Sequence, residues 1–196
     1  WNDDDLFLFE RSAELIGIEL EHLANRERLE WLSTTDHLTG LLNRGTFETY
    51  LTDRVFAKIS KKMTTGVLVF IDFDNFKLIN DSQGHKVGDK ALIKLANFLT
   101  TLARPGDLVS RFGGDEFAIW LNDVDKSQAR KLLQPLLFNK NFIREFSVDQ
   151  RKPFGISAGI VSLDRSRDET SSDLIERADV LMYQRKRNKK RRQASK

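Results

Sequence analysis

Short apolar runs separated by helical patterns predict that the chain folds as an α+β sandwich with a ferredoxin-like βαββαβ core. Two observations carry this prediction. The apolar runs are of strand length and are bounded by acidic or glycine residues. They follow the order strand, helix, strand, strand, helix, strand, which is typical of an antiparallel central sheet with helices on one face. A further helix is expected ahead of this core.

The first thirty-odd residues predict a helix with an apolar seam. Apolar residues recur there at alternating steps of four and three, at Phe9, Ala13, Ile16, Leu20 and Leu23. This spacing is typical of a two-helix seam. A second stripe lies on a different face of the same helix and consists of Ile18, His22, Asn25, Leu29 and Leu32. Such a change of phase is typical of a locally rewound coiled coil, or of a helix that leaves one partner and packs on another. An amphipathic helix packed on its own catalytic domain is an alternative.

A strand at 67–72 is expected at the centre of the core, because residues 67–71 form a continuous apolar run of the kind that is buried on both faces. A helix over 44–60 precedes it. Helical patterns at 76–81 and 88–102 follow, the second with apolar residues at steps of four. The remaining strands are expected at 108–112, 117–121 and 154–163, and the remaining helices at 126–138 and 172–188.

Gly113 and Gly114 lie between two strand-like runs and predict a tight hairpin, because glycine adopts positive φ at little cost. Asp115 and Glu116 then lie at the tip of this hairpin. Two adjacent carboxylates repel each other unless a cation is shared between them. Taken alone, these local signals fit either a solvated turn or a metal site.

A second group of acids ends the central strand. Alternation along that strand places Asp72 and Asp74 on one face and Phe73 on the other. If this strand neighbours the hairpin, the two groups meet and form a site of hard oxygen ligands, which suits magnesium. The chain has no cysteine and three histidines, so a zinc site is not expected.

Composition sets broad limits. With 196 residues and 40% apolar residues, the chain can hold one catalytic domain with a packed core and a short appendage. The formal charge is +3, and the basic excess is concentrated at 185–192, at the end of the last expected helix. No segment looks like a signal peptide or a membrane span, so a cytoplasmic location is expected, with membrane attachment of a longer protein left open. The first residue is Trp1, which suggests a chain cut from a longer one.

Five sequence motifs follow one another at a specific spacing. They are Asp-His-Leu-Thr-Gly-Leu-Leu-Asn-Arg (36–44), Ile-Asp-Phe-Asp-Asn-Phe-Lys-Leu-Ile-Asn-Asp (71–81), Gly-His-Lys-Val-Gly-Asp (84–89), Arg-Phe-Gly-Gly-Asp-Glu-Phe (111–117) and Ala-Asp-Val-Leu-Met-Tyr-Gln (178–184). In this order they resemble the GGDEF domain of diguanylate cyclases. The resemblance covers residues 33 to 190 and implies the palm-like fold of nucleotidyl cyclases, an elaboration of the predicted core.

The resemblance implies a metal site at the two acid groups. Asp72, the backbone carbonyl of Phe73, Asp115 and Glu116 match the residues that place two Mg²⁺ ions on a triphosphate, and Mn²⁺ could substitute. Asp115 also matches the acid proposed as the base for the ribose 3′-hydroxyl, and Glu116 is the second signature acid. Lys77 matches a lysine that faces the phosphates.

The resemblance also implies which residues bind the substrate, GTP. Asn80 and Asp89 match the pair that reads the guanine edge, and His85 lies in the same segment. An aspartate can accept from both N1–H and the exocyclic amine of guanine, a donor pair that adenine lacks. From local chemistry alone, Asn80 or Asp89 could instead cap a helix, His85 could fill a polar pocket and Lys77 could be plain surface.

The basic end of the chain departs from the family pattern. Lys186 and Lys190 fall where the resemblance implies contacts to the triphosphate. The usual Gly-Arg-Asn is replaced by Lys189-Lys190-Arg191. Because lysine offers a point charge rather than a bidentate fork, this contact is expected to be weaker or shifted.

Arg104 and Asp107 have the Arg-x-x-Asp pattern at the family's spacing before the signature, where the resemblance implies an inhibitory site for cyclic di-GMP. An Arg fork can grip phosphate and stack on guanine, and an Asp can accept from the base edge. Pro105 and Gly106, which lie between these two residues, also predict a turn, and a turn is the simpler local interpretation.

The sequence therefore predicts a diguanylate cyclase that condenses two GTP into cyclic di-GMP and pyrophosphate, as a homodimer because each chain offers one guanine site. Its expected parts are a signalling helix (1–32), which resembles the closing helix of a GAF-type sensory domain, the catalytic domain (33–190) and a basic tail (191–196). An upstream sensor is expected in the full-length protein. A non-catalytic receptor for GTP or cyclic di-GMP is the alternative. A third alternative, a palm-like domain that binds nucleic acid, is supported only by the basic tail, so no nucleic acid is expected as a partner.

Overall fold

The structure is a computed structural model that describes residues 3–53, 65–138, 146–147, 154–164, 166 and 169–194. The chain divides into two compact units, Trp1–Thr35 and Asp36–Lys196. No helix in the described part of the chain is both long and apolar enough to cross a membrane.

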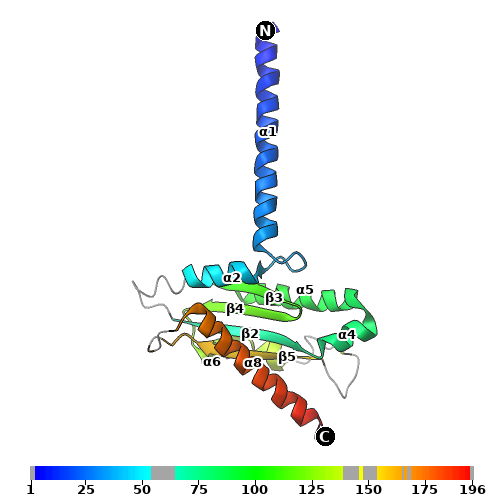
Figure 1. The fold of residues 1–196 in the computed structure, drawn as a ribbon, viewed down its shortest axis with the longest axis vertical. Coiled ribbons are helices and arrows are strands. Elements are labelled where there is room, and N and C mark those ends of the chain that lie inside the picture. Colours follow the sequence, from blue (N-terminus) through cyan, green and yellow to red (C-terminus); the bar gives the residue numbers. More distant parts are fainter. Residues whose placement is uncertain are drawn as a thin grey trace. The chain divides into compact units, whose positions relative to one another are not determined.

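The first unit is one helix, α1 (Asp3–Thr34) (Figure 1). Hydroxyl groups in its last turn bond back to the helix: Thr34 Oγ1 donates to the Glu30 carbonyl at 2.7 Å, and Thr35 Oγ1 donates to the Trp31 carbonyl at 2.7 Å. Its large apolar side chains that the structure describes are exposed in the single chain, at 47% to 68% of their full area. They are Leu15, Ile16, Ile18, Leu20, Leu23, Leu29, Trp31 and Leu32. The side chains of Phe9 and Ala13, in the predicted seam, lie outside the described ones.

The second unit is built on a five-stranded sheet in the order β1-β3-β4-β2-β5 (Figure 1). The strands are β1 (Leu42–Asn43), β2 (Gly66–Asp74), β3 (Leu108–Gly113), β4 (Glu116–Asn122) and β5 (Gly155–Ser162). The last four pair antiparallel in the order of the predicted βαββαβ core. β1, which the sequence analysis did not predict, pairs parallel with β3, so the sheet as a whole is mixed.

Six helices of this unit fall within the described residues, and most follow the predicted ranges. They are α2 (Arg44–Leu51), α4 (Phe76–Gln83), α5 (His85–Leu102), α6 (Lys126–Leu132), α7 (Gln134–Phe138) and α8 (Ser171–Ala194). The single helix predicted at 126–138 is wrong in one respect, because the structure breaks it at Leu133. Pro135 explains the break, because its nitrogen carries no N–H that could donate to the Lys131 carbonyl one turn earlier. Residues 54–60 of the helix predicted at 44–60 lie outside the described part.

Helices cover both faces of the sheet, which corrects the prediction of helices on one face (Figure 1). The two helical connections inside the core, α4–α5 and α6–α7, do share one face, where they pack on Val67, Val69 and Ile71. Helices α2 and α8 cover the opposite face over Leu68 and Phe70. The physical reason lies in β2, which is buried at every position and therefore requires cover on both sides.

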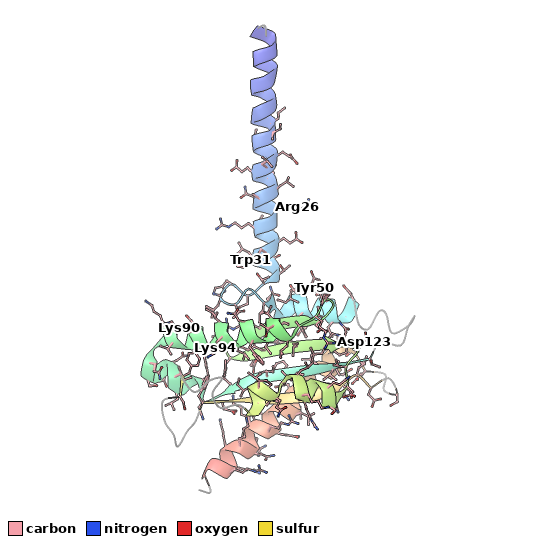
Figure 2. The ribbon with its side chains drawn as sticks, turned by 180° about the vertical axis from the view of Figure 1, so that it is seen from behind. Arg26, Trp31, Tyr50, Lys90, Lys94 and Asp123 are labelled. Carbon is pink, nitrogen blue, oxygen red and sulfur yellow. The ribbon has the colours of Figure 1, made fainter. Side chains whose placement is uncertain are left out.

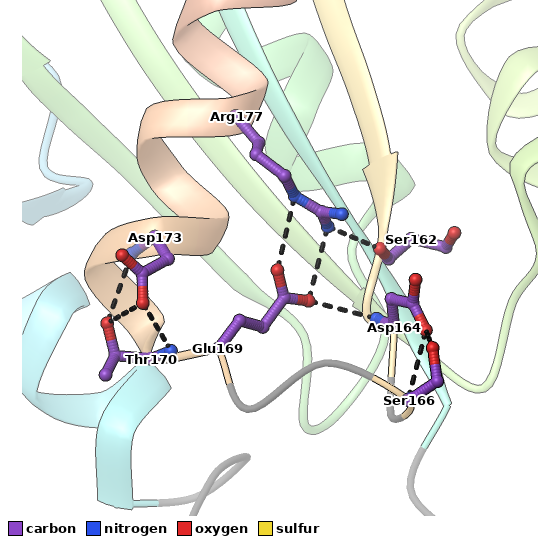
Figure 3. A network of polar contacts seen from close by, with 7 residues as sticks. All are labelled: Ser162, Asp164, Ser166, Glu169, Thr170, Asp173 and Arg177. Atoms are coloured by element: carbon purple, nitrogen blue, oxygen red, sulfur yellow. Dashed lines mark hydrogen bonds and ion pairs between the residues drawn. The ribbon is translucent and has the colours of Figure 1, made fainter.

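The start of α8 is anchored to the end of β5 by polar contacts (Figure 3). Thr170 and Asp173 cap the helix reciprocally, with the Thr170 N–H donating to Asp173 at 2.8 Å and the Asp173 N–H donating to Thr170 Oγ1 at 3.2 Å. Arg177 forms an ion pair with Glu169 at 3.2 Å and donates to the Ser162 carbonyl at 2.8 Å. These contacts fix the register of α8 along β5.

Close packing continues along the same pair of elements. A Cβ at Gly159 of β5 would overlap the Ala178 carbonyl oxygen and lie 2.7 Å from the Met182 nitrogen, so glycine permits the helix backbone to approach the strand. Farther along, Arg185 Nη1 donates to the Ala158 carbonyl at 2.7 Å. Lys189 donates to the Ile156 carbonyl. The four residues from Arg185 to Lys189 rise by about 6 Å along the helix, which nearly matches the about 6.7 Å spanned by two residues of the strand.

Candidate active site

The end of β2 presents two acids on the face that α8 covers. Asp72 and Asp74 are 6% and 8% exposed and follow Phe70 on that face. Phe73 points to the other face, where its ring stacks on Phe154 at a centroid distance of 4.7 Å and on Phe76 at 5.7 Å. The alternation predicted from the sequence is thus the one found, and the aromatic stack fixes the strand end that carries both acids.

The signature hairpin connects β3 to β4 through two glycines with positive φ, 146° at Gly113 and 51° at Gly114. Arg111 stabilises it: the guanidinium donates to the Gly114 carbonyl at 2.7 Å from Nη2 and to both carboxylate oxygens of Asp36 at 3.0 and 3.1 Å. Burial disfavours the charge of Asp36, but hydrogen bonds from Thr39 and Arg111 outweigh it and hold the Asp36 pKa below its usual value. The hairpin is therefore tied to the loop before β1.

Strand pairing brings the two acid groups together. Asp72 lies directly opposite Glu116 in the β2–β4 register. Burial raises the pKa of Asp72 to about 6, with repulsion from Asp115 and Asp74 adding to the effect and Lys186 opposing it. Burial likewise raises the pKa of Asp115. The Glu116 pKa is raised by burial and by repulsion from Asp179 and Asp115. The carboxylates are thus close enough to repel one another in a site partly shielded from water.

Lysines of α8 neutralise the acids of β2. Lys186 Nζ donates to Asp72 Oδ1, and Lys189 Nζ donates to Asp74 Oδ2 at 2.9 Å. Ser157 Oγ completes the surroundings of Asp74 with a hydrogen bond to Oδ1 at 2.6 Å. Lys186 also attracts Asp115 and Glu116. One ammonium therefore interacts with all three predicted metal-ligating carboxylates.

The chemistry of these donors fits a small divalent cation. Within the described residues, no group of three or more histidine, cysteine or acidic side chains is arranged to hold a metal ion. Magnesium does not require such a group, because it is usually held by one or two carboxylates while water and substrate phosphates fill its other positions. Asp72 and Asp115 repel each other and already share the Lys186 cation, so a position where positive charge is favoured exists between them.

A pocket of about 570 Å³ opens beside these acids, where α4, α5 and α8 meet the hairpin. It brings together six of the residues predicted to act on the substrate, Lys77, Asn80, His85, Asp115, Lys186 and Lys190. Phe73, the predicted carbonyl ligand, also lines it. Asp72 and Asp89 do not line this pocket. Asp89 lies half-buried in the first turns of α5.

Asn80 has an unusual environment in this pocket. Its Oδ1 is buried, and within the described residues it has no hydrogen-bond partner. A Cβ at Gly88 would overlap this oxygen and lie 3.1 Å from the Phe76 ring, so glycine at that position makes room for the amide. An orphaned buried acceptor is costly unless a ligand donates to it.

The Arg104–Asp107 segment forms a turn whose aspartate is used in the fold. Asp107 Oδ2 accepts from the Arg104 N–H at 2.8 Å, and Oδ1 accepts from the Asn122 N–H at 2.8 Å. Gly106 has a φ of 98°, which fits the predicted Pro-Gly turn. The Arg104 residue is exposed. The carboxylate of Asp107 therefore holds the turn against β4 whatever else it binds.

Several residues near the site were assigned no role by the sequence analysis. Asp36 and Arg111 brace the hairpin, Lys189 neutralises Asp74, and Asp179 lies close enough to raise the Glu116 pKa. All of these except Lys189 lie inside the quoted motifs. The motifs contain Asp36, Arg111 and Asp179, but the charged side chain that each of them meets lies far away in the sequence. Only the fold shows which residues meet.

The family profile described as "Diguanylate cyclase, GGDEF domain" matches residues 33–192. The chain belongs to this GGDEF family. Diguanylate cyclase DgcP of Escherichia coli K12 is 38% identical over 163 residues, covering 81% of this chain and 46% of the relative. The uncharacterized protein YtrP of Bacillus subtilis 168 is 34% identical over 171 residues, covering 85% of this chain and 27% of the relative.

Solved GGDEF structures share the fold. The coiled coil and GGDEF domain of DgcB from Caulobacter crescentus, in complex with c-di-GMP, aligns with a TM-score of 0.73 at 27% identity and covers 95% of this chain and 96% of that one. Diguanylate cyclase SiaD of Pseudomonas aeruginosa, in complex with its activator SiaC, aligns with a TM-score of 0.66 at 26% identity, covering 94% and 70%. Among the first curated relatives, this GGDEF chain spans between 14% and 51% of their length.

Replacing Asp72 by Asn tests, in metal-free protein, whether the raised pKa of this carboxyl makes stability depend on pH. Its pKa rises from 3.8 to about 6 on folding, so the stability linked to its proton is complete below 3.8 and is lost as the pH rises through about 6. The free energy of unfolding of Asp72→Asn relative to wild type should therefore increase between about pH 4 and about pH 7 in denaturant titrations. Asp81→Asn, which makes the same substitution at an exposed position of α4, is the control. A pH-independent difference for Asp72→Asn would contradict the raised pKa.

Proposed function

We propose that this GGDEF domain is an active diguanylate cyclase that condenses two GTP molecules into cyclic di-GMP with release of pyrophosphate. The observation that carries the proposal is the meeting of Asp72, Asp115 and Glu116 with Lys186 beside a pocket of about 570 Å³. A non-catalytic receptor would need the guanine-binding residues but not three carboxylates held against their mutual repulsion. The relatives named diguanylate cyclases support the same choice.

The acids would hold two Mg²⁺ ions per GTP, or Mn²⁺ in their place. Asp72, the Phe73 carbonyl, Asp115 and Glu116 supply the hard oxygens, and triphosphate oxygens would complete the coordination. Bound there, the ions neutralise charge on the reacting phosphates. Lys186 contacts Asp72 in the structure, and with nucleotide present its ammonium would turn to the phosphates, where Lys77 and Lys190 of the same pocket assist it.

Guanine would bind at the α4–α5 end of the pocket. Asn80 offers the buried Oδ1, and an N–H of the base would satisfy it. Asp89, which follows Gly88 on α5 and does not itself line the pocket, would accept from N1–H and the exocyclic amine of the bound base. His85 lines the pocket at the start of the same helix. Gly88 makes room for the Asn80 amide at this position.

Asp115 would act as the general base. It lines the pocket, and burial raises its pKa toward neutral pH, which suits a carboxylate that accepts the proton of a ribose 3′-hydroxyl. The oxygen freed of its proton would attack the α-phosphate of a second GTP. The P–O bond to pyrophosphate would break, and two such events close the ring.

Asp115→Asn tests the proposal. We expect this variant to lower the formation of cyclic di-GMP from GTP and Mg²⁺ by at least about a hundredfold, because it removes a base and a metal ligand. Separation of the nucleotides by chromatography provides the measurement. Full activity of the variant would show that this acid is not needed, and wild-type protein that binds GTP without forming product would assign the domain as a receptor.

Asp123→Asn is the matched control. Asp115 and Asp123 flank the two ends of β4, and Asp123, labelled in Figure 2, is exposed with a φ of 52° that asparagine also adopts. This variant should keep wild-type activity. Both variants should unfold at the same temperature as the wild type to within a few degrees.

Arg104→Ala tests whether the turn before β3 binds the product. Solved GGDEF structures in complex with c-di-GMP support the presence of such a site. We expect added cyclic di-GMP to inhibit the variant less than the wild type while the initial rate is unchanged. Arg104 is the better probe of the pair, because removing Asp107 would also free two backbone N–H groups. Unchanged inhibition would leave the segment as a turn with no ligand.

Catalysis is proposed to need two chains, because each one offers a single guanine pocket and the two GTP molecules must face each other. The apolar side chains of α1 are exposed in the single chain and would form the seam between two copies. Specific activity should rise with protein concentration and fall when Leu20 and Leu23 are both replaced by Glu. Arg26→Glu changes the charge of a residue that belongs to neither apolar stripe of the sequence and is labelled in Figure 2, and it should leave this dependence intact. Full activity per chain in a sample that stays monomeric during turnover would exclude the two-chain mechanism.

A further inference from the structure

The cations of α8 form two stripes that line different pockets. Lys186 and Lys190 lie four residues apart and line the proposed GTP pocket. Arg185, Lys189 and Arg192, at steps of four and three, line a second pocket of about 470 Å³ beside β5. The basic end of the chain is therefore two separate surfaces, and only the first belongs to the proposed catalytic reaction.

The second pocket lies at the edge of the sheet, since β5 is its last strand. Three elements build it. β5 contributes Ile156, Ala158 and Ile160, whose side chains are almost fully buried, α6 and α7 contribute Arg130 and the half-buried Leu137, and α8 contributes its second cationic stripe. Convergent charged groups over an apolar base are typical of a small-molecule site, and the volume lies within the usual range of about 300–1,000 Å³.

Positive charge in this pocket is concentrated. Among the described residues that line it, none is acidic. Arg185 is half-buried, and burial together with the charge of Arg130 lowers its pKa. Two guanidinium groups from different helices thus repel each other across the pocket, and an anion placed between them would relieve this repulsion.

Existing hydrogen bonds limit what can bind. Arg185 and Lys189 already donate to the Ala158 and Ile156 carbonyls on the outer edge of β5. A peptide that added to the sheet as a further strand would compete with these bonds. A guanidinium has five N–H donors, so Arg185 can keep its bond to the strand and still grip a phosphate.

We propose that this pocket binds a phosphorylated small molecule about the size of a mononucleotide. Its phosphate lies between Arg130, Arg185 and Arg192, where charge-assisted and bidentate hydrogen bonds are available. Its ring stacks on a guanidinium plane. The site is separate from the proposed GTP pocket, and binding there requires neither Asp115 nor Asn80.

Adenosine 5′-monophosphate is a suitable probe, because adenine lacks the donor pair that the proposed guanine site would read. Titration into the full chain, followed by NMR, should shift the backbone amides of Ala158 and Ile160. The double variant Arg130→Gln and Arg192→Gln should bind this probe more weakly, with a dissociation constant at least about tenfold higher. Adenosine without phosphate should not bind at these concentrations, and inorganic phosphate should shift the same amides at higher concentration.

The matched control is the double variant Lys77→Gln and Lys190→Gln, which removes the same charge from the other pocket. It should change the dissociation constant by less than about twofold. Equal weakening by both double variants would overturn the proposal in favour of general attraction to a basic surface. The absence of amide shifts along β5, equally tight binding of adenosine, or retention of affinity in the Arg130 and Arg192 variant would also overturn it. Thermal unfolding of each variant checks that the fold is intact.

Discussion

The pairing of lysines on α8 with acids at the end of β2 is the interaction on which the functional part of this domain depends. A strand that is buried on both faces would normally end in apolar residues, and two carboxylates at its end are costly unless a cation meets them. Lys186 and Lys189 provide that compensation for Asp72 and Asp74. The lysines can do so because Gly159 permits close approach of α8 and because the Arg177 contacts set its register. The packing of α8 on β5 therefore determines whether its lysines can reach the acids of β2.

Compensation in this site is partial. The Asp72 pKa is raised to about 6 although Lys186 contacts the carboxylate, because burial and repulsion from Asp115 and Asp74 exceed the attraction. Asp115 and Glu116 show raised pKa values from burial as well. A site with unbalanced negative charge is destabilising by itself and gains most from additional cations. The same imbalance that costs stability would therefore favour the binding of metal ions with a nucleotide.

Local patterns in the sequence predicted the parts of the fold that depend on local rules. Alternation placed Asp72 and Asp74 on one face, and the glycine pair placed Asp115 at a hairpin tip, as the structure shows. The five motifs led to the GGDEF family. The sequence did not reveal that α2 and α8 cover the second face, since an apolar run shows that β2 is buried but not which helices bury it. Strand β1, of two residues, is too short to give a periodic signal.

The partners of each functional residue were harder to predict, because they depend on the register between elements far apart in the chain. Lys189 illustrates this limit. In the sequence it is one of several cations and a departure from the expected Gly-Arg-Asn, and the expected consequence was a weaker or shifted phosphate contact. In the structure it bonds to Asp74 and the Ile156 carbonyl on one stripe of α8, while Lys190 lines the proposed GTP pocket on the other. A single helix can serve two pockets because neighbouring residues point about 100° apart around its axis. The charge of each residue is visible in the sequence, but its assignment to a pocket depends on how α8 lies on β5.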